Sequence, residues 1–451
     1  MKKNIILLAI ILLSAVLPRV EAADREILRF SLRQACDFAV LKNLEVKNAR
    51  LDVIMAARKT WETTAIGLPQ LSAALSYTNM LKIPTTLIPA KFFDPDAAED
   101  DFIDVKFGTQ HNASLELTAT QLVFNGSYIV GLQAAKVYQQ LSKNQLEKKE
   151  IDIREAVSGN YYLVLMAENN LKILEQTRAN LHQSVYEVGE LFKAGFVEES
   201  DVDQLSLNLS ELDSLLATSR NQVELTRRLL KFQMGLELEV EIELTETLEG
   251  ILADIKELKV AEEEIDLSRH IDFRIMETQE KSMALLLKRE KSEFLPTITA
   301  FFSLSRSAMR NRFNFLARDE KWFPASVVGL NFSMPIFSSG QRLARVAQAK
   351  LELRKAENLK KQVADSLQLA LEKARTEYQD ACARVESSTQ SVNLARRIYE
   401  NSRIKFNKGL LDTMSLTQVH NQYLNAESNR TQALVALFNA RNDFEKAMNR
   451  L

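Results

Sequence analysis

Residues 327–357 read VVGLNFSMPIFSSGQRLARVAQAKLELRKAE, and within them the hydrophobic period changes from two residues to three or four. Upstream, apolar residues alternate with smaller or polar ones and should project from one side of a strand: Val328, Leu330, Phe332, Met334 and Ile336. Pro335 then removes a backbone donor, and the Ser338-Ser339-Gly340 turn can cap a helix that starts after it. Downstream there is neither Pro nor Gly before Gly409. The stretch predicts a strand that leads directly into a very long helix.

The same switch occurs earlier, in residues 119–136, where Phe124-Asn125-Gly126 corresponds to Phe337-Ser338-Ser339-Gly340. Two further pairs of similar segments support a repeat. Residues 68–78 (LPQLSAALSYT) match residues 295–305 (LPTITAFFSLS), and the glycines of Phe192-Lys-Ala-Gly195 and Phe406-Asn-Lys-Gly409 are 214 positions apart, as are Gly126 and Gly340. We therefore expect a tandem duplication of strand, loop, strand, long helix, turn and long helix.

These elements together resemble the TolC-type outer-membrane efflux family. The resemblance rests on a Leu-Pro before a strand, a strand ending in Phe near a Gly, and a glycine at each helix tip, in the same order twice over. It covers essentially the whole mature chain. It implies a homotrimer with a shared twelve-stranded transmembrane β-barrel, continued by an α-helical periplasmic barrel, and it implies a periplasmic adaptor and an inner-membrane transporter as partners.

The first residues have the pattern of a secretory signal: Lys2-Lys3, an apolar core, and Val20-Glu21-Ala22 before the expected cleavage. We divide the chain into a signal peptide (1–22), a first repeat (23–235), an equatorial linker (236–262) and a second repeat (263–451). Charges interrupt every later apolar run, so a membrane-embedded part would consist of strands.

Composition excludes some classes of partner. The chain has 58 basic and 60 acidic residues, which argues against nucleic acid as a partner. With only 12 Gly and 8 Pro in 451 residues, long helices are expected. We expect Cys36 and Cys382 to be separate buried thiols, with a disulfide as the alternative in an exported protein.

Several helices can be placed. Ser31 should cap a helix from Leu32 to Ile66. The long helices should span about 127–193 and 341–408, and the returning helices about 199–234 and 414–448. In the second long helix one apolar row advances by slightly more than 3.6 residues per turn, which favours a nearly straight seam: Leu359, Val363, Leu367, Ala370, Ala374, Tyr378, Ala381 and Val385. Residues 236–244 alternate strictly with glutamate, which predicts a short surface strand around the middle of the helical rod.

Two strands per half alternate apolar and polar residues. In the second strand, Glu116, Thr118 and Thr120 should face a barrel lumen, while Leu115 and Leu117 face lipid. A half-buried soluble strand is the alternative. Because four strands leave two open edges, copies must share one barrel, with eight, twelve or sixteen strands for two, three or four chains. The pattern does not choose among these; the resemblance implies three.

The connections at the strand ends are expected to be extracellular loops, residues 79–107 and 308–325. The first contains an acidic cluster that reads as a solvated loop, with cation binding as the alternative: Asp94, Asp96, Glu99, Asp100, Asp101 and Asp104. An aromatic girdle at the membrane interface is expected from Phe92, Phe93, Trp322 and Phe323.

Gly195 and Gly409 should lie at the periplasmic tips, because glycine adopts the left-handed backbone conformation of a helix-ending turn at the lowest energetic cost. The resemblance implies that the adaptor docks at these tips. It also implies that acidic residues six and nine positions after the second tip glycine can form a selectivity ring.

In this chain those two positions hold Ser415 and Gln418, and the nearest acid is Asp412. On the first hairpin, Asp201 and Asp203 follow the tip glycine. We hypothesise that any cation preference at the gate arises from these two aspartates; the alternative is that they cap the returning helix.

The sequence contains no nucleotide-binding glycine loop, metal-ligand cluster or nucleophile motif. We expect the four scattered histidines to be ordinary surface or helix-face residues: His111, His182, His270 and His420. We therefore expect no enzyme and no cofactor. The preferred interpretation is a passive outer-membrane exit duct driven by an inner-membrane pump. A periplasmic helical adaptor or scaffold is the alternative, and a small self-contained porin would leave most of the chain unexplained.

Overall fold

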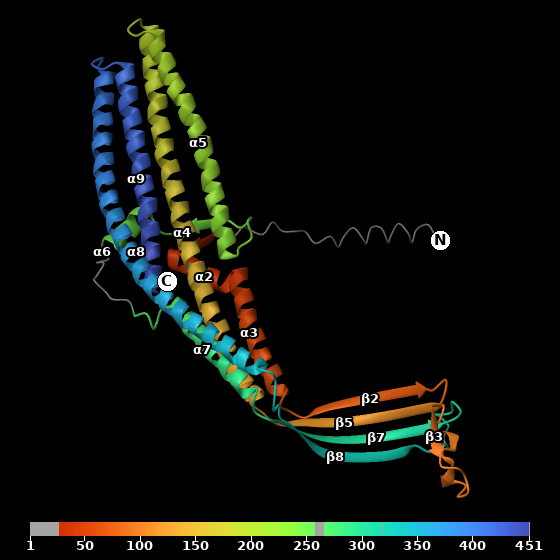
Figure 1. The fold of residues 1–451 in the computed structure, drawn as a ribbon. Coiled ribbons are helices and arrows are strands. Elements are labelled where there is room, and N and C mark those ends of the chain that lie inside the picture. Colours follow the sequence, from red (N-terminus) through yellow and green to blue (C-terminus); the bar gives the residue numbers. More distant parts are fainter. Residues whose placement is uncertain (1–26, 258–265, 318, 451) are drawn as a thin grey trace, which may run out of the picture. The chain divides into compact units, whose positions relative to one another are not determined.

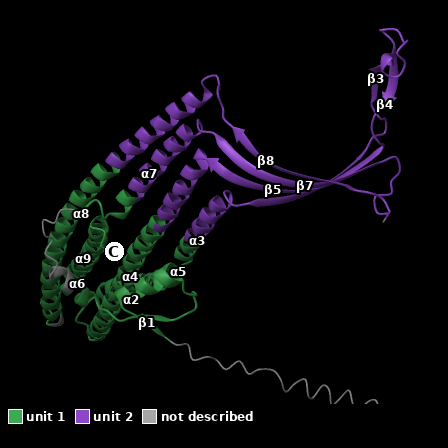
Figure 2. Cartoon of the chain, turned by 90° about the horizontal axis from the view of Figure 1, so that it is seen from below, with its two compact units in different colours: residues 1–51, 144–274, 362–451 green, residues 52–143, 275–361 purple. Residues whose placement is uncertain are grey.

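The computed structural model describes residues 27–257, 266–317 and 319–450, so the expected signal peptide lies outside the described residues. The chain is mixed α and β, as predicted, and divides into two compact units (Figure 2). We call residues 1–51, 144–274 and 362–451 the helical unit, and residues 52–143 and 275–361 the sheet unit. Each unit contains segments from both halves of the sequence. No helix in the described ranges is long and apolar enough to cross a membrane.

The sheet unit is built on four antiparallel strands in the order β2 (Gln70–Asn79), β5 (His111–Asn125), β7 (Thr297–Arg310) and β8 (Phe323–Ser333) (Figure 1). Each lies where the sequence predicts a strand. The central pairing of β5 with β7 joins the first half of the sequence to the second. β2 and β8 each pair on one side only within the described chain.

Strand β8 ends earlier than expected. The alternation predicted a strand up to Ile336, but β8 ends at Ser333, so Met334 and Ile336 lie beyond it. The last pair in the β7–β8 ladder joins Thr297 to Ser333. Pro296 directly precedes Thr297, and Pro335 lies two positions after Ser333. A proline has no backbone N–H with which to continue the ladder.

The segment 79–107, expected to be a loop, contains a second small sheet. β3 (Thr85–Pro89) pairs antiparallel with β4 (Phe102–Lys106), and a short 3₁₀ turn, η1 (Ala90–Phe92), follows β3. The segment connects β2 to β5, as expected, and these two short strands within it were not predicted. Thr-Thr-Leu-Ile and Phe-Ile-Asp-Val are rich in residues that favour strands. Each run is too short for alternation of apolar and polar residues to identify it as a strand.

Two helical hairpins dominate the helical unit. α4 (Gly126–Lys193) turns into α5 (Glu199–Met234), and α8 (Gln341–Asn407) turns into α9 (Thr413–Ala447). α4 and α8 begin in the sheet unit and continue into the helical unit. These bounds match the expected ones to within two residues. The match follows from the absence of Gly and Pro over most of both hairpins.

The buried row of α8 has a different period from the one expected. In its helical-unit part, buried residues recur every seven positions: Tyr378, Val385, Val392, Tyr399 and Phe406. A 3.5-residue repeat is the spacing of a left-handed coiled coil. The row predicted from Leu359 to Val385 is buried only in its second half, because Leu359 is exposed and Val363 and Leu367 are half-buried.

The helix expected from Leu32 to Ile66 is broken. Ser31 caps α2 (Leu32–Lys42) through a capping box with Gln34, but Asn43 leaves the helical conformation and α3 (Leu44–Ala65) begins after it. The Asn43 side chain accepts a hydrogen bond from the Glu45 N–H (2.7 Å) and donates one to the Gln233 carbonyl (2.8 Å). A contact 190 positions away along the chain therefore fixes a break that local spacing does not reveal.

A short parallel sheet in the helical unit joins β1 (Leu28–Phe30) to β6 (Ile242–Leu244). Leu28 pairs with Ile242, and the sequence separation of 214 equals the spacing of the repeated glycines. Of the residues 236–244 expected to form a strand, only Ile242–Leu244 do so. The Lys231 ammonium donates to the carbonyls of Leu238 and Val240 (3.2 Å to the latter), which holds that segment out of the ladder. The domain boundaries remain a prediction.

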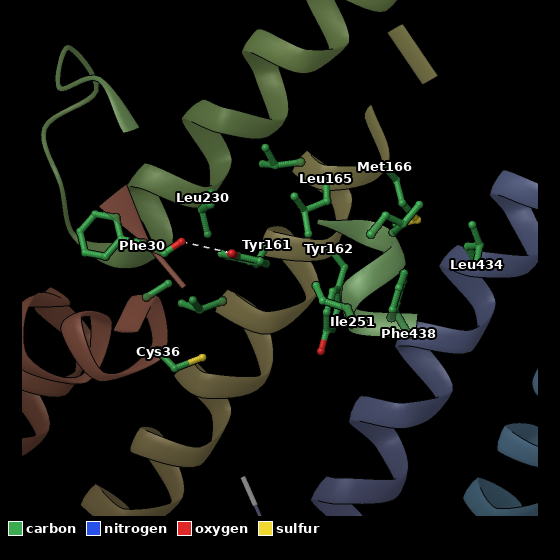
Figure 3. Close-up of a cluster of buried hydrophobic side chains, with 14 of the residues drawn as sticks. Phe30, Cys36, Tyr161, Tyr162, Leu165, Met166, Leu230, Ile251, Leu434 and Phe438 are labelled. Atoms are coloured by element: carbon green, nitrogen blue, oxygen red, sulfur yellow. Dashed lines mark hydrogen bonds between the residues drawn. The ribbon is translucent and has the colours of Figure 1, made fainter. Parts of the chain in front are cut away.

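The main core of the helical unit gathers side chains from most of its elements (Figure 3). The Tyr161 hydroxyl donates to the Phe30 carbonyl (3.1 Å), tying β1 to α4. The ring of Tyr162 stacks on Phe438 of α9 at 4.3 Å between centroids. Cys36 is buried beside Ser158, and both cysteines are free, as expected, although Cys382 is only half-buried. The remaining helices are α6 (Leu248–Glu257) and α7 (Ile271–Ser292).

The two strand-to-helix switches use their glycines differently. Gly126 is the first residue of α4, and a Cβ there would lie 2.8 Å from Leu295 Cδ1 and 3.0 Å from the Ser292 carbonyl oxygen. Gly340 has φ +80° with open space around it. It ends the connection from Pro335, whose carbonyl accepts a bond from Arg342 (2.9 Å). Gly126 is thus required for close packing, and Gly340 for its backbone conformation.

Gly126→Ala should lower the free energy of unfolding by about 1–3 kcal/mol, because the added methyl group meets backbone and side chain of the α7 end. Gly189→Ala is the matched control, since Gly189 lies inside α4 with no atom within 4 Å of the Cβ position. There the substitution should raise stability by up to about 1 kcal/mol. Denaturant unfolding in detergent measures both; equal effects would contradict the close contact.

Candidate channel lining, tips and gate

One face of the four-stranded sheet is polar. Residues paired across antiparallel strands share a face, so Glu116, Thr118 and Thr120 lie together, opposite Ser305, Ser303 and Phe301 of β7. On the other face, Leu115 and Leu117 are paired with Leu75 and Ala73 of β2. The structure therefore brings the three candidate lumen residues together on a single surface, which we call the hydroxyl face.

Side chains on the hydroxyl face are linked by hydrogen bonds. The Ser303 hydroxyl donates to Glu116 Oε1 (2.8 Å), and the Thr118 hydroxyl donates to the same oxygen (3.1 Å). Ser76 and Ser114 share a hydroxyl–hydroxyl bond of 2.7 Å. The alternation in the sequence indicated the face but not these bonds, because Ser303 is 187 positions from Glu116.

The two hairpin tips have the same backbone geometry. Gly195 (φ +80°) donates its N–H to the Phe192 carbonyl (2.9 Å), and Gly409 (φ +72°) donates to that of Phe406 (2.8 Å). In both turns the residue after the glycine also bonds back to a carbonyl in the helix, which completes a Schellman motif. Three large apolar side chains at the tips are strongly exposed: Phe196, Leu410 and Met414.

The candidate gate residues of the second hairpin are engaged in helix capping. Asp412 is the N-cap of α9, and its carboxylate accepts from the Ser415 N–H (2.8 Å) and hydroxyl (2.7 Å). These bonds lower the pKa of Asp412 below its usual value. Gln418 lies further along α9 and is exposed.

On the first hairpin, Asp201 lies in the first turn of α5, where its carboxylate accepts the Glu198 N–H (3.3 Å). Asp203 is exposed two residues later. Asp201 therefore makes a helix-capping contact of the kind that the alternative interpretation predicts. A role of these carboxylates in a gate remains a prediction.

A buried polar cluster between α8 and α9 was not predicted. Glu427 is 4% exposed and pairs with Arg396 (3.0 Å) and Arg430 (3.8 Å). The Arg396 guanidinium lies over the ring of Tyr423, 5.9 Å from its centroid. Positions 396 and 399 on α8, with 420, 423 and 427 on α9, have helical spacing that marks one face of each helix. The residue types at these positions gave no signal that Tyr399, His420 and Glu427 are buried.

Two histidines expected on the surface are buried. His420 is 5% exposed, stacks on Tyr399 at 5.1 Å, and its Nε2 has no hydrogen-bond partner in the described chain. Burial lowers the pKa of His420 to about 4. His270 at the start of α7 is 4% exposed, and burial lowers its pKa as well, although Asp272 opposes the shift. The surface assignment failed for both because these positions face neighbouring helices.

An aromatic cluster closes the end of the sheet where the second long loop leaves β7. Tyr77 donates to or accepts from His111 Nδ1 (2.9 Å) and packs edge-on against Phe313 (5.5 Å between centroids). Arg310, buried beneath the loop, donates to the Asn314 carbonyl (2.8 Å) and lies over the ring of Phe315. No group of three or more His, Cys, Asp or Glu in the described residues is arranged to hold a metal ion.

Comparisons with known proteins agree with this architecture. Residues 265–450 match the family model described as outer membrane efflux protein. No curated protein sequence matches the chain.

The fold is similar to several solved structures. The outer-membrane channel OprN is 17% identical, with 92% of this chain and 89% of that chain covered and a TM-score of 0.69. The Campylobacter jejuni CmeC outer membrane channel is also 17% identical (92% and 85% covered, TM-score 0.71). CusC, in a structure concerned with transmembrane channel formation, is 15% identical (93% and 92% covered, TM-score 0.72).

These findings confirm the predicted resemblance to the TolC-type outer-membrane efflux family. At such identities the structural likeness shows the fold, and the family match covers residues 265–450, which is less than half of the chain. The description of the matched family model, outer membrane efflux protein, agrees with the predicted location in the outer membrane.

The burial of His420 predicts a pH-dependent stability. Because the folded-state pKa is about 4 and the unfolded value about 6.5, protons bind the unfolded chain more tightly. The free energy of unfolding should therefore fall as pH drops from about 6.5 to about 4, by about 3 kcal/mol, and this loss should level off below pH 4.

Denaturant unfolding across this pH range tests the effect. His420→Phe keeps a ring against Tyr399 but cannot titrate, so its stability should fall less steeply with acid. His182→Gln, a change at an exposed histidine of α4, should keep the wild-type slope. Identical slopes for the wild type and His420→Phe would show that His420 is not the titrating group.

Proposed function

We propose that the chain is one subunit of an outer-membrane channel that provides the exit duct of a multicomponent efflux or secretion system. The observation that carries the proposal is the four-stranded sheet with one apolar face, one polar face and two unpaired edges, in a chain whose second half matches outer membrane efflux proteins. The duct is passive, and an inner-membrane pump supplies the energy for export.

Closure of the barrel requires other copies of the chain. In hydrocarbon an unpaired backbone N–H or C=O costs several kcal/mol, so the free edges of β2 and β8 must be paired. Pairing β2 of one copy with β8 of the next satisfies both edges with a single type of contact. Three copies give the homotrimeric, twelve-stranded barrel that the family resemblance implies, with the hydroxyl face toward the lumen and the opposite face toward outer-membrane lipid.

The exposure of the apolar face supports lipid contact over a soluble subdomain. Leu71, Leu75, Val328 and Leu330 are each at least 70% exposed in the single chain. A periplasmic helical adaptor or scaffold, the alternative function, would leave this surface in water. Fractionation separates the two: the channel is a detergent-requiring oligomer of the outer membrane, and the scaffold is a soluble periplasmic protein.

The helical unit would extend into the periplasm, with Gly195 and Gly409 at the tips that contact the adaptor. Two features support this role for the tips: both turns adopt the same conformation, and both expose large apolar side chains. Exposed apolar groups at a rigid turn are suited to burial against a protein partner.

Leu117→Arg should impair membrane insertion far more than Thr118→Arg. Leu117 lies on the lipid face and Thr118 on the hydroxyl face, and an arginine in the lipid face costs about 2–4 kcal/mol near the bilayer midplane. The measurement is the amount of oligomer extracted from outer membranes. Equal amounts of the two variants would argue against a lipid-facing sheet.

Gly195→Val and Gly409→Val should reduce efflux without lowering the amount of protein in the membrane. A β-branched residue strains a left-handed turn by about 1–2 kcal/mol and alters the docking surface. Gly340→Val is the matched control, because Gly340 has the same φ of +80° as Gly195 but lies away from the tips. Resistance assays should show loss for the tip variants only; equal loss in all three would implicate strain rather than docking.

A further inference from the structure

The four-stranded sheet contains a single carboxylate. Strands β2 and β8 contain no charged residue, β7 contains Arg306 and Arg310, and β5 contains Glu116. Arg306 is paired with Leu115 and Pro324, which places it on the face opposite Glu116. Arg310 is paired with His111 and therefore lies on that same opposite face. Within the four strands, Glu116 is thus the only charged residue on the hydroxyl face.

The contacts of Glu116 fix its position without neutralising it. Both hydrogen bonds, from Ser303 (2.8 Å) and Thr118 (3.1 Å), go to Oε1, and no hydrogen bond or ion pair reaches Oε2 from the described residues. The directly opposite residues, Ala74 of β2 and Ser305 of β7, carry no charge. The side chain remains exposed in the single chain. A carboxylate held in this way keeps its charge directed at the space beside the sheet.

We infer that Glu116 makes the barrel segment of the duct selective for cations over anions. The inference rests on the proposed function, because only a shared lumen turns one carboxylate per chain into a ring. A carboxylate on the lipid face would be strongly unfavourable, whereas in a water-filled lumen it raises the local concentration of cations. In bulk water one such charge about 10 Å away changes that concentration about twofold.

The location differs from the hypothesis based on the sequence, which assigned cation preference to Asp201 and Asp203 at the gate. The carboxylates of Asp201 and Asp412 accept backbone N–H groups at helix starts, which disperses part of their charge into the helix end. Glu116 has no such partner. The preference should therefore belong to the sheet, and the capped carboxylates of Asp201 and Asp412 should contribute little.

Salt concentration provides a signature of this mechanism. The Debye length is about 30 Å at 0.01 M salt and about 3 Å at 1 M, so a ring around a wide lumen acts only in dilute salt. The preference should be clear in 10 mM KCl and vanish in 1 M KCl. A narrow dehydrated filter would keep its preference at high salt.

The test is the reversal potential of the full-length protein in planar bilayers under a KCl gradient. Glu116→Gln keeps an oxygen that can accept both hydroxyl bonds but removes the charge, and the permeability ratio of K⁺ over Cl⁻ in dilute salt should fall at least twofold toward unity. Arg306→Gln, on the opposite face of the sheet, should retain the wild-type ratio. Asp201→Asn should also retain it.

A second variant leaves Glu116 in place. Ser305→Lys puts a positive charge opposite Glu116 on the same face, and it should abolish the cation preference even if Glu116→Gln inserts poorly. An unchanged ratio in either inserted variant, or loss of the ratio in Asp201→Asn, overturns the inference and leaves the channel function intact. Absence of any ion conductance in the inserted wild-type protein overturns the proposed function itself.

Discussion

The outer edges of β2 and β8 impose the constraint on which the rest of the sheet unit depends. Each edge presents backbone donors and acceptors that no described strand satisfies, and the same sheet exposes a largely apolar face. Water would satisfy the edges but not the face, and lipid would satisfy the face but not the edges. Association with further copies resolves both demands. In the helical unit the two hairpins bury apolar rows in cores within one chain, and side chains such as Leu207, Leu225 and Phe232 of α5 remain exposed.

The parts of the fold that the sequence predicts are those in which local chemistry acts over many residues. The long hairpins follow from tens of positions without Gly or Pro, and the four strands follow from alternation across ten or more residues. The errors occur where a contact between residues far apart in the sequence determines the local structure. The break at Asn43 depends on the Gln233 carbonyl, and the three-residue strands β1 and β6 are too short to carry a period. The heptad row of α8 was missed because burial against neighbouring helices, rather than hydrophobicity alone, selects it.

The candidate site shows the same division. Alternation indicates which residues share the hydroxyl face, but it cannot indicate that Ser303 and Thr118 both bond one oxygen of Glu116. For the hairpins, repeat spacing correctly identified the two tip glycines as turn residues. It gave no signal for the Glu427 cluster or for His420, because polar residues in a charged helix look the same whether they face solvent or a neighbour. Gate roles depend on several copies, so neither one sequence nor one chain determines them.

The pairing of β1 with β6 has a consequence for how the chain folds. β1 lies in the first repeat and β6 in the expected linker, and they align in parallel with an offset of 214 residues, the spacing of the repeated glycines. If the two halves were separate chains, they would have to associate to form this contact. The fraction of chains that make the contact would then depend on their concentration. Covalent linkage makes the encounter intramolecular, with an effective concentration set by the connecting segment. The duplication thereby removes mass action from the formation of this sheet, and leaves it only for the association of whole subunits.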